Sequence, residues 1–190
     1  MVFDIGIGKT HIPLFCYKDD TTVEIQEGGT KTVAELKVGD NIKSLNWLEQ
    51  TGSTFSKVID ATIIEGSFTA HTLLFSNGSS LTVTSPHYMI VYKGENVKVV
   101  PAVDVRIGDC MRMRDGNLSS VVRVDDIQID RKVNVTTESG LMYANGVLAT
   151  GMCENSPKEV SSAEKFLLDY KEIHKNFVPI NQNKNLIKNI

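Results

Sequence analysis

The stretch LTVTSPHYMIV, residues 81–91, is an apolar β-run that contains a threonine and a histidine three positions apart. On a regular strand Thr84 and His87 would face opposite sides of the sheet, because side chains alternate. Pro86 lies between them, and proline removes a backbone donor and fixes φ. We therefore predict a bend at Ser85 and Pro86 that turns both polar side chains toward one point.

Runs on both sides of this stretch predict an all-β protein. Asn77 and Gly78 separate the apolar run 71–76 from the run 81–92, and both residues tolerate positive φ, so we expect a two-residue hairpin turn. Further runs rich in β-branched residues predict strands at 23–25, 58–64, 121–129 and 133–137.

One segment of the chain is repeated. AELKVGDNIK at residues 34–43 is followed, 69 positions later, by VDVRIGDCMR at residues 103–112, and nearly every position keeps its residue type. A solenoid needs at least three repeats, whereas a single pair indicates two similar subdomains. We expect two β-subdomains related by pseudo-twofold symmetry.

The totals of the chain limit its function classes. With 190 residues it has room for one domain, and its net charge of -3, with lysines and acids interspersed, provides no basic face for nucleic acid. No run approaches the roughly 18 apolar residues that a membrane span requires. Residues 1–15 lack the charged start and apolar stretch of a signal peptide. We expect a monomer with no nucleic-acid partner and no transmembrane segment.

The composition changes near the C-terminus. After Cys153 a polar linker begins, and Ser161 and Glu164 then form a capping-box pattern before apolar residues at helical spacing. We therefore divide the chain into an N-terminal segment (1–15), a β-domain (16–153) and a C-terminal linker, amphipathic helix and tail (154–190).

The candidate nucleophile is a cysteine. Three cysteines are too few for a disulfide framework, and an odd number leaves at least one thiol free. Cys16 lies between a proline-containing stretch and the first strand, a position that we interpret as a domain boundary and not as core. Cys110 falls inside a strand of the second repeat and is expected in the core. Cys16 is therefore the preferred nucleophile, and histidine is a suitable activating base for it.

The ordered set of motifs resembles the Hint domain, the autoprocessing module shared by hedgehog C-terminal regions and inteins. The matching pieces are Cys16 followed by an aromatic residue, GGTK at 28–31, VGD at 38–40, the Thr-x-x-His motif that ends at His87, and NGVLAT at 145–150. The last two are closer to the hedgehog branch, called Hog, than to inteins. The resemblance implies an all-β, horseshoe-like Hint fold with an internal pseudo-twofold repeat, to which we add the short C-terminal helix.

The resemblance also implies roles for individual residues. The Cys16 sulfur attacks the Phe15 carbonyl in an N-to-S acyl shift, while His87, aided by Thr84, polarises the amide and protonates the departing nitrogen. The product is a thioester of the N-terminal segment, which is the substrate of its own domain. Free cysteine has a pKa of about 8.5 and histidine one of about 6.5, so the histidine can exchange protons at neutral pH whereas the thiol needs activation.

The acceptor of the acyl group is the open part of this hypothesis. The chain lacks the His-Asn ending of inteins, so splicing is not expected, and the hedgehog branch implies a sterol, another lipid or water as the resolving nucleophile. An upstream acid would assist, and Asp60 and Glu65 are both candidates. Cys153 lies near the C-terminal cysteine of the family and has three interpretations: it pairs with Cys16, resolves the thioester or is buried.

The resemblance implies no cofactor, no metal and a secreted or extracellular location. One departure is Phe15, since hedgehog proteins have glycine before the nucleophile and a bulky residue slows attack at its carbonyl. Two alternatives therefore stay open: a Cys-His hydrolase that acts in trans, and a non-catalytic β-module with Hint-like residues.

Overall fold

The computed structural model describes residues 15–45, 53–94 and 96–151. These residues form β-strands and two short 3-10 helices, with no α-helix among them, so the all-β prediction is confirmed. In chain order the elements are β1 (Tyr17–Lys18), β2 (Thr22–Glu24), β3 (Thr30–Thr32), η1 (Val33–Glu35), β4 (Asn41–Leu45), β5 (Ser53–Phe75), β6 (Ser80–Thr84), β7 (Tyr88–Lys93), β8 (Asn96–Pro101), η2 (Ala102–Asp104), β9 (Cys110–Arg112), β10 (Leu118–Thr137), β11 (Leu141–Ala144) and β12 (Val147–Thr150). No helix in this described part is long and apolar enough to cross a membrane.

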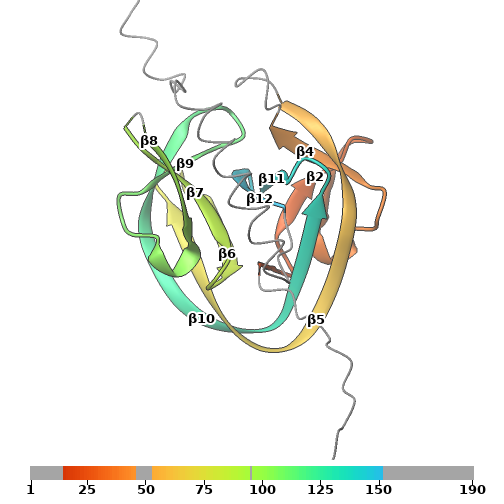
Figure 1. Cartoon of the computed structure of the whole chain (residues 1–190), viewed down its shortest axis with the longest axis horizontal. Helices are drawn as coiled ribbons and strands as arrows, with labels where there is room; N and C mark the ends of the chain where they lie inside the picture. Colours follow the sequence, from red (N-terminus) through yellow and green to blue (C-terminus); the bar gives the residue numbers. More distant parts are fainter. Residues whose placement is uncertain (1–14, 46–52, 95, 152–190) are drawn as a thin grey trace, which may run out of the picture.

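Two long strands, β5 and β10, form the frame of the molecule. They pair antiparallel over most of their length, from Val121 opposite Phe75 to Thr137 opposite Val58. Figure 1 shows them side by side along a curved, horseshoe-like path that joins two lobes. The prediction of separate strands is wrong here, because cross-strand pairing carries β5 and β10 through the polar residues that interrupt the apolar runs.

The two copies of the repeat occupy equivalent places, one in each lobe (Figure 1). Each copy begins within a 3-10 helix and continues through a Gly-Asp turn into a short strand that pairs with one of the two long strands, β4 with β5 and β9 with β10. In the first copy the Lys37 N–H donates to Asp40 Oδ2 at 2.9 Å, and in the second the Arg106 N–H donates to Asp109 Oδ2 at 2.9 Å. The pseudo-twofold arrangement expected from the repeat is therefore present.

The two Asn-Gly pairs of the described part make different turns. Asn145–Gly146 is a two-residue loop between β11 and β12, and both residues have positive φ, 48° and 77°. In the other pair only Gly78 has positive φ, and the hairpin loop contains three residues, 76–78. The two-residue turn predicted there is wrong, because the Ser76 N–H donates to the Ser120 carbonyl of β10 at 2.8 Å and joins the loop.

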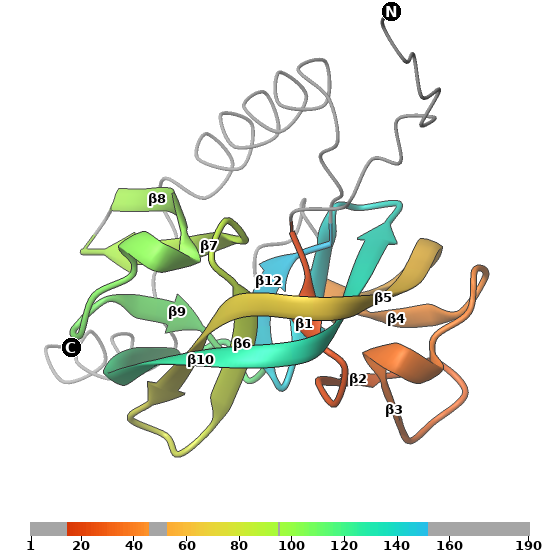
Figure 2. The same cartoon turned by 90° about the horizontal axis from the view of Figure 1, so that it is seen from below.

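Strand β1 is short but central. Tyr17 pairs with Val83 of β6 on one side and with Val133 of β10 on the other, and Figure 2 shows β1 in the middle of the molecule. All three side chains belong to the main hydrophobic core. Cys16, directly before β1, is 0% exposed, so its interpretation as a boundary residue outside the core is wrong. Cys110, which was expected in the core, is partly exposed.

Part of the predicted organisation lies outside the described residues. Cys153, the amphipathic helix and the tail fall beyond residue 151, and residues 1–14 precede the described part. The domain bounds set at 1–15, 16–153 and 154–190 therefore stay predictions.

The Gly-Asp turn of each repeat provides a test of this architecture. Gly39 and Gly108 have φ of 100° and 92°, and a Cβ at either position would have nothing within 4 Å. Gly108→Ala should therefore lower the free energy of unfolding in urea by about 1–2 kcal/mol through backbone strain alone. The neighbouring change Ile107→Ala, at a side chain that is 70% exposed, should alter it by less than about 0.5 kcal/mol. Equal stability of Gly108→Ala and the unsubstituted protein would contradict this turn geometry.

Candidate active site

The Thr84 side chain bonds to the backbone of Cys16. Strands β6 and β1 lie side by side, and the Thr84 N–H donates to the Cys16 carbonyl at 3.0 Å. In the other direction the Cys16 N–H donates to the Thr84 hydroxyl at 3.1 Å, where a regular ladder would use the Thr84 carbonyl. The same hydroxyl donates its proton to the Cys16 carbonyl at 3.3 Å, so it acts as an acceptor toward the amide nitrogen of the Phe15–Cys16 bond.

A tight turn takes the chain from Thr84 to His87. The His87 N–H donates to the Thr84 carbonyl at 3.0 Å, which closes a four-residue turn through Pro86. The turn thus uses the carbonyl that a regular ladder would offer to Cys16. The bend predicted from Pro86 is present, and it brings His87 back toward β1.

The His87 side chain is buried beside the two residues that flank Cys16. Its ring centroid is 4.6 Å from that of Tyr17 and 6.5 Å from that of Phe15, and both contacts are edge-on. Burial lowers the pKa of His87 from 6.5 to about 3. The imidazole is therefore neutral at neutral pH.

The hydrogen-bond pattern assigns the tautomer of His87. The Thr150 hydroxyl lies 3.3 Å from His87 Nε2 and donates its one proton to the Tyr88 carbonyl at 3.0 Å. His87 Nε2 must then carry the hydrogen, so Nδ1 is the unprotonated ring nitrogen. Nδ1 is buried and has no hydrogen-bond partner among the described residues. The lowered pKa contradicts the expectation that His87 exchanges protons freely at neutral pH, so Nδ1 is a hydrogen-bond acceptor that takes a full proton only at a high free-energy cost.

Tyr17 and Thr150 complete the surroundings of the histidine. The Tyr17 hydroxyl donates to the Thr150 carbonyl. Burial, followed by the charge of the neighbouring Cys16, raises the pKa of the Tyr17 phenol well above its ordinary value, so this donor stays protonated. Neither residue has a role in the sequence-based hypothesis, although Tyr17 is the aromatic residue of the first motif and Thr150 ends the last one.

A buried asparagine of β10 lies opposite Cys16 and bonds to an aspartate of β5. The register pairs Tyr17 with Val133, and its continuation sets Asn134 opposite Cys16. Asn134 is fully buried, and its Nδ2 donates to Asp60 Oδ2 of β5. Its Oδ1 has no hydrogen-bond partner in the described part of the chain. Asn134 thus links Asp60 to the position of Cys16, a link that the sequence pattern did not indicate.

The other candidates are not brought to this point. Glu65, the alternative acid, pairs with Arg131 at 3.1 Å and its side chain is 73% exposed. Cys153 lies outside the described residues, so its three interpretations stay untested. Within the described ranges, no three His, Cys, Asp or Glu side chains gather as metal ligands.

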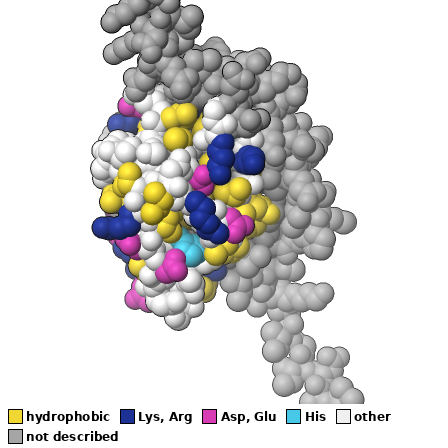
Figure 3. Space-filling model, turned by 90° about the vertical axis from the view of Figure 1, so that its left-hand side faces the viewer, with side chains coloured by type: hydrophobic (Ala, Val, Ile, Leu, Met, Phe, Trp, Pro, Cys, Tyr) yellow, Lys and Arg dark blue, Asp and Glu magenta, His cyan; other side chains and the backbone are white. Residues whose placement is uncertain are grey.

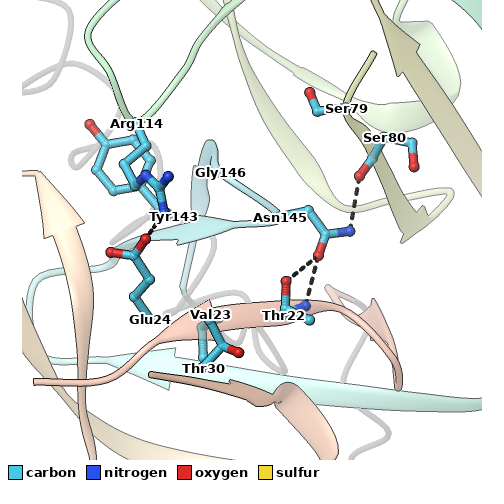
Figure 4. A pocket seen from close by; sticks show the side chains of 10 residues that line it. All are labelled: Thr22, Val23, Glu24, Thr30, Ser79, Ser80, Arg114, Tyr143, Asn145 and Gly146. Atoms are coloured by element: carbon cyan, nitrogen blue, oxygen red, sulfur yellow. Dashed lines mark hydrogen bonds and ion pairs between the residues drawn. The ribbon is translucent and has the colours of Figure 1, made fainter. Parts of the chain in front are cut away.

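An open pocket of about 350 Å³ is lined by none of the predicted site residues. Figure 4 shows an ion pair between Glu24 and Arg114 on one side and Asn145 on the other. The Asn145 amide accepts from the Thr22 N–H at 2.7 Å and donates to the Ser80 carbonyl at 2.9 Å. We interpret this pocket as a structural junction in which the β11–β12 turn holds β2 and β6 together.

Sequence comparison connects the chain to one family. The family model of the Hint module matches residues 11–184. Two relatives come from Caenorhabditis elegans: Warthog protein 4 is 25% identical over 146 residues, and Warthog protein 8 is 28% identical over 137 residues. Each match covers 64% of this chain and 24% of the relative, so the chain spans about a quarter of the length of the curated relatives it matches.

Solved structures share the fold. A DnaB intein from Synechocystis sp. PCC 6803 superposes with a TM-score of 0.63 at 14% identity, over 73% of this chain and 99% of that one. An intein-like domain from Clostridium thermocellum gives a TM-score of 0.60 at 18% identity, over 71% of this chain and 97% of that one. At such identities the likeness establishes the fold alone. With the family model covering most of the sequence, the chain belongs to the Hint family of self-processing domains.

Proposed function

We propose that this domain cleaves its own peptide bond between Phe15 and Cys16 by an N-to-S acyl shift. The observation that carries the proposal is the pair of contacts around that bond. The Cys16 N–H donates to the Thr84 hydroxyl, and the His87 ring, with its bare Nδ1, lies beside both flanking residues. Because one turn supplies both groups, they are oriented before the reaction and little entropy is lost in reaching the transition state.

The proton balance follows from the tautomer of His87. Because the pKa of His87 is low, its Nδ1 takes the thiol proton of Cys16 only as the sulfur bonds to the Phe15 carbonyl carbon, in one concerted step. The Cys16 nitrogen then leaves with the proton from Nδ1, while the Thr84 hydroxyl, which donates to the Cys16 carbonyl at 3.3 Å, accepts from the N–H of the departing nitrogen and orients it. The products of this step are a thioester on the Cys16 sulfur, a free Cys16 amino group and a neutral His87.

Phe15 has a defined place in this arrangement. Its side chain is 7% exposed, and its ring lies 4.9 Å from the Tyr88 ring, centroid to centroid. These contacts hold the residue on the acyl side of the scissile bond, where hedgehog proteins have glycine. The bulk of Phe15 is therefore compatible with the proposed chemistry.

Release requires a second nucleophile. Asp60 accepts from Asn134, the residue opposite Cys16, and is the base that we assign to remove the proton of an acceptor hydroxyl. A sterol, another lipid or water supplies this hydroxyl, and the N-terminal segment leaves on it. The proposal includes an extracellular setting and a monomer that acts on its own chain.

The neutral state of His87 predicts a pH dependence of stability. Between pH 6.5 and about 3 the unfolded histidine binds a proton and the folded one does not, so its contribution is complete above pH 6.5 and is lost as pH falls. The free energy of unfolding should therefore fall, relative to that of His87→Gln, by on the order of 1 kcal/mol per pH unit below pH 6.5. Urea unfolding of both proteins between pH 7 and pH 4 measures this difference. Parallel pH profiles would contradict the buried neutral histidine.

Thiol-induced cleavage tests the proposed reaction itself. With a tag fused before Met1 and dithiothreitol added, the N-terminal segment should be released, and Cys16→Ala should abolish the release. His87→Ala should slow it by about 100-fold or more, and Thr84→Val by about tenfold, because the hydroxyl at the scissile nitrogen is lost. Gel electrophoresis of time points gives these rates.

The matched control for this assay is Thr82→Val on the same strand. Its hydroxyl bonds to Thr72 at 2.8 Å and not to Cys16, so the cleavage rate should stay unchanged. Release that survives in Cys16→Ala rules out the mechanism. An intact fusion under every thiol condition would instead support the non-catalytic β-module.

The role of Asp60 predicts a separation of the two steps. Asp60→Asn should leave release by dithiothreitol unchanged, because a thiol can itself attack the thioester. It should slow release by cholesterol at least about tenfold, because the hydroxyl acceptor loses its base. Glu65→Gln is the matched control, and both rates should equal those of the unsubstituted domain. A loss of cholesterol-dependent release in Glu65→Gln alone would transfer the role to Glu65.

A further inference from the structure

A separate chain of hydrogen bonds, which we call the relay, joins Ser85, His71 and Asp126 at the same turn. Ser85 follows Thr84 directly, so the two side chains leave the chain on opposite sides. The Ser85 hydroxyl is 2.9 Å from His71 Nε2, and His71 Nδ1 is 2.7 Å from Asp126 Oδ1. The three members come from the turn, from β5 and from β10, and the relay does not include Cys16.

The chemistry of these groups assigns the proton positions. The Asp126 carboxylate can only accept, so His71 Nδ1 carries the hydrogen and Nε2 is bare. Nε2 then accepts from the Ser85 hydroxyl, whose other acceptor, the Thr69 carbonyl, is farther away at 3.4 Å. This is the arrangement of a serine nucleophile, a histidine base and an orienting carboxylate.

A cavity of about 280 Å³ opens beside His71 and Asp126. Its remaining walls are Val103, Val105, Arg106, Ile107 and Val124. Two of these apolar side chains are unusually exposed, Val103 at 49% and Ile107 at 70%. Figure 3 shows this side of the molecule, where hydrophobic side chains lie among charged ones and a histidine. Ser85 does not line the cavity but bonds to two residues that do, His71 and Val103, so the cavity offers apolar surface next to the relay.

Arg106 provides a positive charge that is tied to the same turn. Its Nη1 donates to the Val103 carbonyl at 2.8 Å and to the Val105 carbonyl at 3.1 Å. The Val103 N–H in turn donates to the Ser85 carbonyl at 3.1 Å. A guanidinium held in this way can stabilise negative charge on a substrate oxygen.

We propose that Ser85, His71 and Asp126 form a second acyl-transfer site, which hydrolyses esters of short apolar acids in trans and independently of Cys16. The valine and isoleucine walls of the cavity bind the acyl chain, and Arg106 stabilises the oxyanion. Ser85 is partly exposed at the turn, so substrate reaches the nucleophile, and Asp126 at the other end of the relay is 77% exposed.

The reaction is balanced in two steps. In the first, His71 Nε2 takes the Ser85 proton, the Ser85 oxygen bonds to the acyl carbon, and the alcohol leaves with that proton. In the second, water gives a proton to Nε2 and bonds to the acyl carbon, and the Ser85 oxygen leaves and recovers the proton. Asp126 accepts from Nδ1–H throughout and is a positioning residue.

The test uses the full chain with Cys16→Ala, which removes the thiol chemistry. A fluorophosphonate probe should label Ser85, as located by peptide mass spectrometry, and the protein should hydrolyse p-nitrophenyl butyrate. Adding Ser85→Ala should abolish the label and lower the hydrolysis rate at least about 100-fold. Adding Asp126→Asn should lower the rate at least about tenfold and shift its pH profile, because the histidine loses its orienting charge.

Ser80→Ala is the matched control, since Ser80 is an exposed serine of β6 outside the relay, and its label and rate should equal those of the Cys16→Ala parent. The exposed Asp126 allows the test without loss of core packing, should Ser85→Ala fold poorly. A label at serines other than Ser85, or equal hydrolysis by the parent and Asp126→Asn, would overturn the proposal and leave the relay as a connection between strands.

Discussion

The site depends on the hydrogen bond from the Cys16 N–H to the Thr84 hydroxyl. It forms because the turn after Thr84 occupies the backbone carbonyl, which accepts from the His87 N–H. It also requires β1 to lie between β6 and β10, where Tyr17 pairs with both neighbours. The long β5–β10 ribbon holds these strands in place, and the lobes at its two ends bury them. A buried peptide bond, a bare imidazole nitrogen and a hydroxyl are thus brought together by strand pairing and not by a flexible loop.

Local sequence predicts the parts of the fold whose causes are local. The repeat at 34–43 and 103–112 contains its own Gly-Asp turn, so its equivalent place in both lobes follows from the pattern. The length of β5 and β10 does not follow from the local pattern, because polar residues stay in these strands only through pairing with the opposite strand. The same applies to the Asn-Gly pair at 77–78, which is drawn into a longer loop by a backbone bond from Ser76 to β10.

In the site, too, some features follow from local sequence and others depend on strand pairing. Pro86 indicates the bend, and the bend explains how Thr84 and His87 reach one point. The burial of Cys16 and the partnership of Asp60 with Asn134 depend on the register of β1 and β10, which no local pattern contains. The turn also separates two sets of polar groups, because alternation directs Thr84 toward Cys16 and Ser85 toward His71. One short segment therefore serves the proposed autoprocessing site and the proposed serine site.

The central claim is that the Phe15 acyl group passes to the Cys16 sulfur. The most direct measurement is the mass of the N-terminal fragment released when the tagged domain is incubated with hydroxylamine. We expect a single fragment that ends in a hydroxamate at Phe15, together with a domain that begins with an unmodified Cys16. A fragment that ends at another residue, or one that carries no hydroxamate at any hydroxylamine concentration, would contradict the thioester.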